Sequence, residues 1–157
     1  MTSSRLFVLS LLLVLIGSHA TVTSSADQLY VKFDEFGDIN CEDEMARLDN
    51  FAVNLQNSPA DKGVIIFYGG RRFRKRLPKR GDAAARAARL KTYLTQRRGI
   101  PTDKVIVIDG GYREEWYAEL WVAPPGVDLP VGRPTISIKE IKFRKGKARA
   151  RDFRCQI

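Results

Sequence analysis

The chain has 157 residues, two cysteines, one histidine and a formal net charge of +9 at pH 7. A chain of this length has room for one domain with a single hydrophobic core. Its histidine, His19, lies in a segment that we expect to be removed on export, which excludes Ser-His and Cys-His catalytic pairs from the mature protein. We therefore expect a non-enzymatic protein with no cofactor and no metal.

Residues 1–20 have the pattern of a secretory signal peptide. One positive charge, Arg5, precedes an apolar run from Leu6 to Ile16, and Ala20 stands where a signal peptidase cleaves. The run is too short to predict a membrane span. Cleavage after Ala26 and an uncleaved N-terminal anchor are the alternatives. The pattern predicts an exported protein, periplasmic or secreted, with no transmembrane segment in the mature chain.

The two cysteines are Cys41 and Cys155. In an oxidising compartment such a pair usually forms a disulfide bond, and two free buried thiols are the alternative. The bond would hold the C-terminal tail against the acidic region around Cys41. Two cysteines without a histidine do not supply the four ligands of a zinc site.

The charge is distributed unevenly along the chain. Asp27–Gly70 carries three basic and nine acidic residues, whereas seven of the ten residues from Arg71 to Arg80 are basic. Arg133–Ile157 carries nine basic and two acidic residues. The chain therefore has two basic segments and one acidic segment, and these could balance part of each other's charge.

The first two predicted elements are a strand and a helix. The segment "QLYVKFDEFGDI" alternates apolar and polar residues, which predicts a strand that ends at Gly37. Asn40 is a suitable helix N-cap, and three acidic residues follow it in the first turn. The helix should end near Asn57 because Pro59 follows.

The middle of the chain predicts a second strand and a second helix. The run "GVIIFY" is apolar throughout, which is typical of a strand covered on both faces, and Gly69 and Gly70 should end it. After the basic segment, Asp82 is the predicted cap of a helix that ends at Gly99. The predicted buried stripe of this helix is Ala83, Ala87, Leu90 and Leu94.

Two further strands complete the predicted domain. "KVIVID" should end at Gly110 and Gly111, and "WYAELWVAP" should follow after a short hairpin-type return. The order β-α-β-α-β-β predicts an α/β fold, a two-layer sandwich with a mixed sheet. We expect the domain to span residues 27–126. A Pro/Gly linker over 127–134 and a short basic C-terminal β extension over 135–157 should follow, with a break between Ile138 and Ile141.

The order of elements and three local segments resemble an OmpA-like domain, the peptidoglycan-associating domain of cell-envelope proteins. The segments are "RAARLKTYLTQRRGI", "DKVIVIDGGY" and "AELWVAPPG". The resemblance covers about Leu29 to Gly126. The chain also resembles a group of secreted bacterial proteins with segments like "KFDEFGDI", "DEMARLDNFA" and "DGGYRE", but that resemblance names no function.

The OmpA-like resemblance implies a ligand site at the start of the second helix. In the family a carboxylate after the second strand holds the ammonium of a diaminopimelate residue, and an arginine of the second helix holds its carboxylate. Arg86 matches the arginine, but Arg71 and Arg72 stand where the carboxylate is expected. The family's Asn and Leu-Ser before the helix are also missing. The resemblance therefore implies that half of the site is kept and that the charge of the other half is reversed.

The candidate ligand-binding residues are Arg71, Arg72, Arg74 and Arg86. Guanidinium groups suit carboxylates and phosphates, and a helix N-terminus adds positive potential. The expected partner is an anionic envelope polymer such as peptidoglycan, or an acidic protein. Nucleic acid would bind in vitro, but an exported protein does not meet it in the cell. The alternatives are a solvated loop without a partner and a secreted, disulfide-stabilised protein–protein interaction module.

Overall fold

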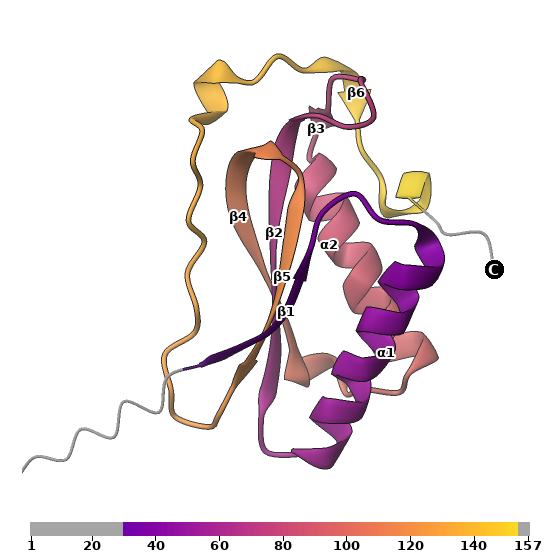
Figure 1. Cartoon of the computed structure of the whole chain (residues 1–157), viewed down its shortest axis with the longest axis vertical. Coiled ribbons are helices and arrows are strands. Elements are labelled where there is room, and N and C mark those ends of the chain that lie inside the picture. The colour runs from indigo at the N-terminus through magenta and orange to yellow at the C-terminus, as the bar shows by residue number, and fades with distance from the viewer. Residues whose placement is uncertain (1–29, 154–157) are drawn as a thin grey trace, which may run out of the picture.

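Two helices cover one face of a four-stranded sheet in the computed structural model, which describes residues 30–153 (Figure 1). The strand order is β1-β5-β2-β4, with β2 parallel to β4 and antiparallel to β5. The strands are β1 (Val31–Phe36), β2 (Lys62–Arg72), β4 (Val105–Glu115) and β5 (Tyr117–Ala123). The predicted α/β class, with two layers and a mixed sheet, is confirmed.

The two helices begin differently. Helix α1 (Cys41–Asn57) begins as predicted, because the side chain of Asn40 accepts a hydrogen bond of 2.8 Å from the backbone N–H of Asp43. Helix α2 (Asp82–Thr92) is capped by Gly81 in a left-handed conformation, φ 78°. The prediction that Asp82 caps this helix is wrong, since Asp82 is already its first residue.

Helix α2 continues as one π-helical turn, η1 (Tyr93–Arg97), and a short 3-10 turn, η2 (Thr102–Lys104), leads into β4. The predicted buried stripe of α2 is confirmed, and the core between helices and sheet also contains Leu48, Phe51, Leu55, Ile65, Phe67 and Leu120. A second, smaller apolar cluster lies on the other face of the sheet around Val64, Ile66 and Tyr68. The sheet is therefore covered by apolar side chains on both faces.

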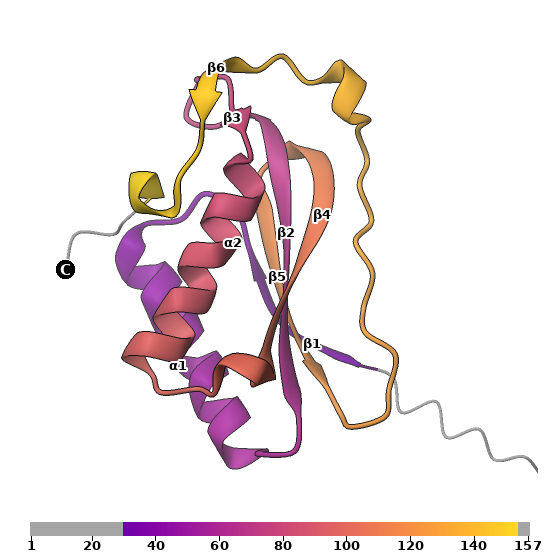
Figure 2. The same ribbon diagram turned by 180° about the vertical axis from the view of Figure 1, so that it is seen from behind.

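The C-terminal part runs along the side of the sheet that faces away from the helices and then returns over the top (Figures 1 and 2). It contains two 3-10 turns, η3 (Ile138–Glu140) and η4 (Ala150–Phe153), and the strand β6 (Arg144–Lys147), which pairs with β3 (Lys79–Arg80). The strand predicted around Ile136 is wrong: Ile136 forms only an isolated bridge with Tyr112. No helix within residues 30–153 has the length and apolarity needed to cross a membrane.

The glycine pairs do not end their strands. Gly69 and Gly70 lie inside β2, and the other pair lies inside β4, so the predicted strand ends are wrong. Strands β4 and β5 lie on opposite sides of β2, and the one residue between them, Trp116, must pass over β2. A Cβ atom on Gly70 would lie 2.5 Å from the backbone nitrogen of Trp116. Gly70 therefore makes room for this crossing.

We expect Gly70→Ala to lower the free energy of unfolding by about 1–3 kcal/mol, because the added methyl group meets backbone atoms that have little freedom to move. Gly37→Ala is the matched control, since the atoms nearest to its added Cβ lie 3.7 Å away or more. That substitution should change stability by less than about 0.5 kcal/mol. Urea denaturation of both variants measures the difference. Equal stabilities would show that the crossing at Trp116 is loosely packed.

Candidate functional site

The basic segment Arg71–Arg80 is structured over most of its length. Its first two residues continue β2, and its last two form β3. Between them Phe73 and Arg76 exchange two backbone hydrogen bonds of 2.8 and 2.9 Å. The two residues at the tip, Arg74 and Lys75, have positive φ angles of 46° and 65°, as a two-residue hairpin turn requires. The segment is a tight turn on the sheet and not the open loop expected from the sequence.

The basic tail packs beside the basic segment. Strand β6 pairs in parallel with β3, with Lys79 opposite Arg144 and Arg80 opposite Lys147. We call this surface, formed by the turn 73–76, β3 and β6, the basic ridge. One carboxylate of the tail, Asp152, balances Lys79 at 3.3 Å. The ridge joins the two most positive segments of the chain.

Two of the predicted site residues are held in ion pairs. Arg71 lies 3.0 Å from Glu114 and 3.1 Å from Glu140. Arg74 lies 3.1 Å from Asp38. The hydrogen bonds that both arginines donate to these carboxylates raise the pKa of the guanidinium groups. Both side chains are exposed, but their charge is balanced within the protein.

Arg72 has a different position from Arg71. Among residues 30–153, its guanidinium group reaches only the backbone oxygen of Lys75, at 3.5 Å. Neighbouring side chains in a strand point to opposite faces of a sheet. Arg72 therefore adds to the charge beside the turn, while Arg71 is tied to the outer segment of the chain through Glu140.

Arg86, the fourth predicted site residue, is buried, with 8 % of its surface exposed. Three aromatic rings surround its guanidinium carbon. The distances to the ring centroids are 3.8 Å for Phe73, 4.1 Å for Phe153 and 4.9 Å for Trp116. Burial lowers the pKa of Arg86 to about 10, so the group is still charged at neutral pH. The four predicted residues thus do not form one open cluster of arginines.

Two hydrogen-bond donors at this position lack an acceptor. Among the described residues, neither Nη2 of Arg86 nor Nε1 of Trp116 has a hydrogen-bond partner, and both atoms are buried. Buried donors are normally paired, because an unpaired one costs free energy. One oxygen-rich anion could accept from donors of this kind. We call Arg86, Trp116, Phe73 and Phe153 the arginine box.

A cavity of about 400 Å³ adjoins the arginine box, and Phe73 and Phe153 line it. Its wall holds two more positive than negative side chains. The positive side chains are Arg74, Arg76, Lys79 and Arg144, and the negative ones are Asp82 and Asp152. The cavity therefore has a wall of net positive charge beside two of the box residues, Phe73 and Phe153, which favours an anion there.

Asp82 makes the charge of this cavity dependent on pH. The residue is buried at the start of α2, and burial raises the pKa of its carboxyl group above the usual range. Arg86, the next cause, acts in the opposite direction. Protonation of Asp82 as the pH falls removes one negative charge from the wall, which favours an anion in the cavity.

The sequence interpretation did not include the three aromatic residues of the arginine box. Phe73 stands between basic residues, Trp116 between two strands and Phe153 near the C-terminus, so they are far apart in the chain. An aromatic residue inside the run "RRFRKR" was a usable signal, since guanidinium groups stack on aromatic rings. Nothing local marked Trp116 or Phe153 as its partners.

The predicted disulfide bond between Cys41 and Cys155 stays a prediction, because Cys155 lies outside the described residues. Cys41 is the first residue of α1. The cleavage sites at Ala20 and Ala26 also lie outside the described part of the chain.

The acidic residues near the N-terminus pair with cations. Asp34 binds Arg47 at 2.6 Å, and Glu35 binds Lys32 at 2.6 Å. Within residues 30–153, no group of three or more His, Cys, Asp or Glu side chains is arranged to hold a metal ion.

No protein-family model matches the chain, and no curated protein is significantly similar to it. The resemblance to OmpA-like domains therefore rests on the sequence segments quoted above.

Proposed function

We propose that this protein is a non-enzymatic binding domain of the cell envelope that takes up a carboxylate-bearing component, such as the stem peptides of peptidoglycan, at the arginine box. The observation that carries the proposal is the pair of buried donors on Arg86 and Trp116, which have no acceptor among the described residues. A carboxylate accepts two such hydrogen bonds and neutralises the buried charge.

A comparison within α2 supports this choice of residue. Arg89 lies one turn after Arg86 and is also mostly buried, but it forms a salt bridge with Glu44 of α1. Arg86 has no carboxylate within ion-pair distance in residues 30–153, although Asp82 lies near enough to influence its charge. A buried arginine without a direct ion pair among the described residues is the one suited to a ligand.

The basic ridge would bring the polymer to the box. Among the described residues, Lys75, Arg76, Lys145 and Lys147 have no carboxylate within ion-pair distance. Exposed charges of this kind act on a polyanion over about 8–10 Å at physiological ionic strength. The ridge therefore favours association with an anionic surface, while the box would select the carboxylate.

The reversed charge at Arg71 and Arg72 argues for a different mode of binding from that of the family the chain resembles. The family's ammonium-holding carboxylate is missing, so a ligand would be held through its carboxylate alone. A ligand whose ammonium group is masked should then bind as well as the free one.

Co-sedimentation with purified peptidoglycan sacculi tests the proposal. We expect Arg86→Met to lower the bound fraction at least about tenfold, because a factor of this size corresponds to the loss of one hydrogen-bonded charge pair. Arg97→Met is the matched control, because Arg97 is an exposed arginine at the C-terminal end of η1. It should bind like the wild-type protein.

Sacculi whose carboxyl groups have been converted to amides lack the charges that both the box and the basic ridge would attract. They should bind the wild-type protein at least as poorly as untreated sacculi bind Arg86→Met, and the comparison of Arg86→Met with Arg97→Met on untreated sacculi assigns the carboxylate to the box. Equal binding to both kinds of sacculi would contradict the role of the box. The protein–protein interaction module, the alternative function, predicts no co-sedimentation at all.

A further inference from the structure

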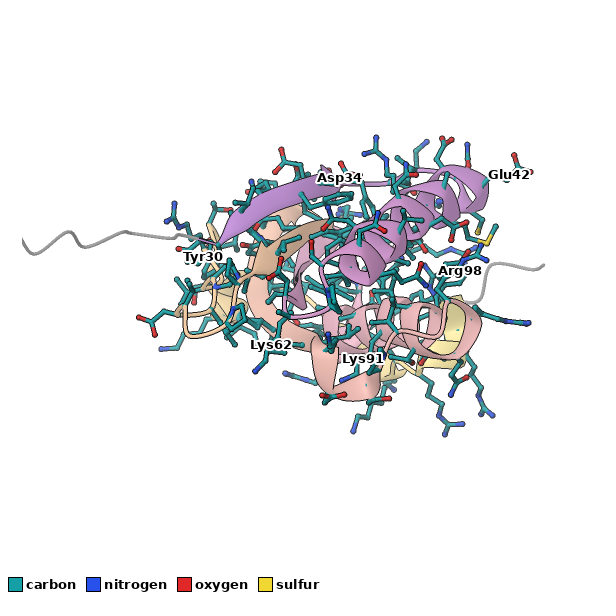
Figure 3. All side chains as sticks on the ribbon, turned by 90° about the horizontal axis from the view of Figure 1, so that it is seen from below. Tyr30, Asp34, Glu42, Lys62, Lys91 and Arg98 are labelled. Carbon is teal, nitrogen blue, oxygen red and sulfur yellow. The ribbon has the colours of Figure 1, made fainter. Side chains whose placement is uncertain are left out.

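A second cavity lies on the opposite face of the sheet, and the proposed function does not use it. Its volume is about 310 Å³, which is at the lower end for small-molecule sites. Tyr30, Tyr117 and Trp121, which line it, pack on the apolar cluster of the face that the helices do not cover. Figure 3 shows Tyr30 on the sheet side of the molecule, away from Lys91 and Arg98 on the helix side.

The aromatic residues give this cavity a fixed apolar wall. Tyr30 and Trp121 meet edge to face, with ring centroids 5.3 Å apart and an angle of 83° between their planes. The indole N–H of Trp121 donates to Glu119 at 3.2 Å, which fixes the orientation of the ring. Rings held in this way present a rigid surface with a polar edge.

The charged residues of the cavity are already paired with one another. Lys32 lies 2.6 Å from Glu35, and Arg113 lies 3.0 Å from the buried Glu119. The hydrogen bond from Lys32, followed by that from Tyr117, lowers the pKa of Glu35. The cavity therefore offers both donors and acceptors at fixed positions, with little net charge from these pairs.

One cation at the rim is not balanced. The backbone of Arg133 is held from both sides, because its N–H donates to Tyr68 at 3.2 Å and its oxygen accepts from Arg113 at 3.3 Å. Its side chain lines the cavity and is exposed. No carboxylate among the described residues lies within ion-pair distance of it. The backbone of Arg133 is thus held at the rim, and its guanidinium group is accessible to an anionic group of a ligand.

We propose that this outer-face cavity binds a saccharide ring that carries a carboxylate. A sugar ring has an apolar face for the aromatic wall and hydroxyl groups that both donate and accept. The paired charges match those hydroxyl groups without requiring a charged ligand, and Arg133 adds the preference for an acid. This inference does not rest on the arginine box, since none of the box residues lines this cavity.

The two tryptophans of the chain make the test specific to each site. The indole N–H of Trp121 lies in the outer-face cavity, and that of Trp116 lies in the arginine box. Heteronuclear NMR of isotope-labelled protein resolves the two indole signals, and Trp121→Phe assigns them. The titrants are trigalacturonic acid, the neutral trisaccharide cellotriose, and acetate.

We expect trigalacturonic acid to shift the Trp121 signal to saturation, cellotriose to do so more weakly, and acetate to leave it unchanged. Arg133→Gln should lower the affinity for trigalacturonic acid about fivefold, which corresponds to the loss of one exposed ion pair. The affinity for cellotriose should not change. Arg97→Gln is the matched control and should alter neither affinity. Tyr30→Leu, which removes part of the aromatic wall, should lower the affinity for both sugars.

Three results would overturn the inference. The first is no movement of the Trp121 signal with either sugar up to about 20 mM. The second is an unchanged affinity for trigalacturonic acid in both Arg133→Gln and Tyr30→Leu. The third is a sugar-dependent shift that disappears in Arg86→Met, which would assign the sugar to the arginine box. Failure of the proposed function would instead leave the Trp121 response intact.

Discussion

Glu44→Ala is expected to lower the free energy of unfolding by roughly 3–5 kcal/mol, because it removes the buried carboxylate that is paired with the charge of Arg89. The salt bridge between these residues joins α1 to α2, and the two side chains are only 10 % and 15 % exposed. Burial lowers the pKa of Arg89, which shows that the surroundings disfavour its charge. Urea denaturation at neutral pH measures the loss.

The exposed pair of Asp38 and Arg74 is the control for this prediction. Its side chains are 41 % and 64 % exposed, so Asp38→Ala should cost at most about 1 kcal/mol. The double substitution Glu44→Leu with Arg89→Met should recover most of the stability, because both charges of this buried pair are then removed. If Glu44→Ala costs no more than Asp38→Ala, the buried salt bridge does not hold the helices together.

The helices and most of the sheet were predictable because their signals are local. The cap at Asn40 and the alternation in β5 both lie within a few residues of what they predict. In β5, Ala118 and Leu120 face the helices, and Tyr117 and Trp121 lie on the other face, as alternation along a strand requires. Such patterns reflect one element and the surface that it buries.

The glycine pairs show where local interpretation was insufficient. A pair of glycines after an apolar run is also typical of a strand end, but here close tertiary contacts require it. Gly70 lies beneath the crossing at Trp116, and a Cβ atom on Gly110 would lie 2.6 Å from the ring of Tyr68. No pattern within the strand itself distinguishes these two causes.

The candidate site was predictable in residue type but not in arrangement. Its central residue, Arg86, was identified from the resemblance to OmpA-like domains, and the sequence interpretation expected it to form one anion-binding site with Arg71. The structure buries Arg86 under Phe73 and Phe153 instead. Phe153 reaches this position because β6 pairs with β3, a contact between two basic segments that charge alone would disfavour.

The remaining prediction concerns the stability cost of keeping Arg86. Burial lowers its pKa to about 10, so the folded protein releases this proton more readily than the unfolded chain. The cost of holding the charge is therefore complete below about pH 10 and declines as the pH rises toward the unfolded value. A lowering of this size corresponds to roughly 3 kcal/mol.

Arg86→Met is thus expected to raise the free energy of unfolding by about 1–3 kcal/mol at neutral pH, with part of the gain offset by lost contacts with the aromatic rings. The gain should be the same at pH 6 and pH 8, since both lie well below the lowered pKa.

Arg89→Met is the matched control on the same helix and should lower stability, because it leaves the buried carboxylate of Glu44 without its counter-charge. Opposite signs for these two substitutions, measured by urea denaturation, would show that Arg86 is retained at a cost to stability, as expected of a residue kept for binding. A loss of stability in Arg86→Met as large as that in Arg89→Met would show that Arg86 is a structural residue of the core.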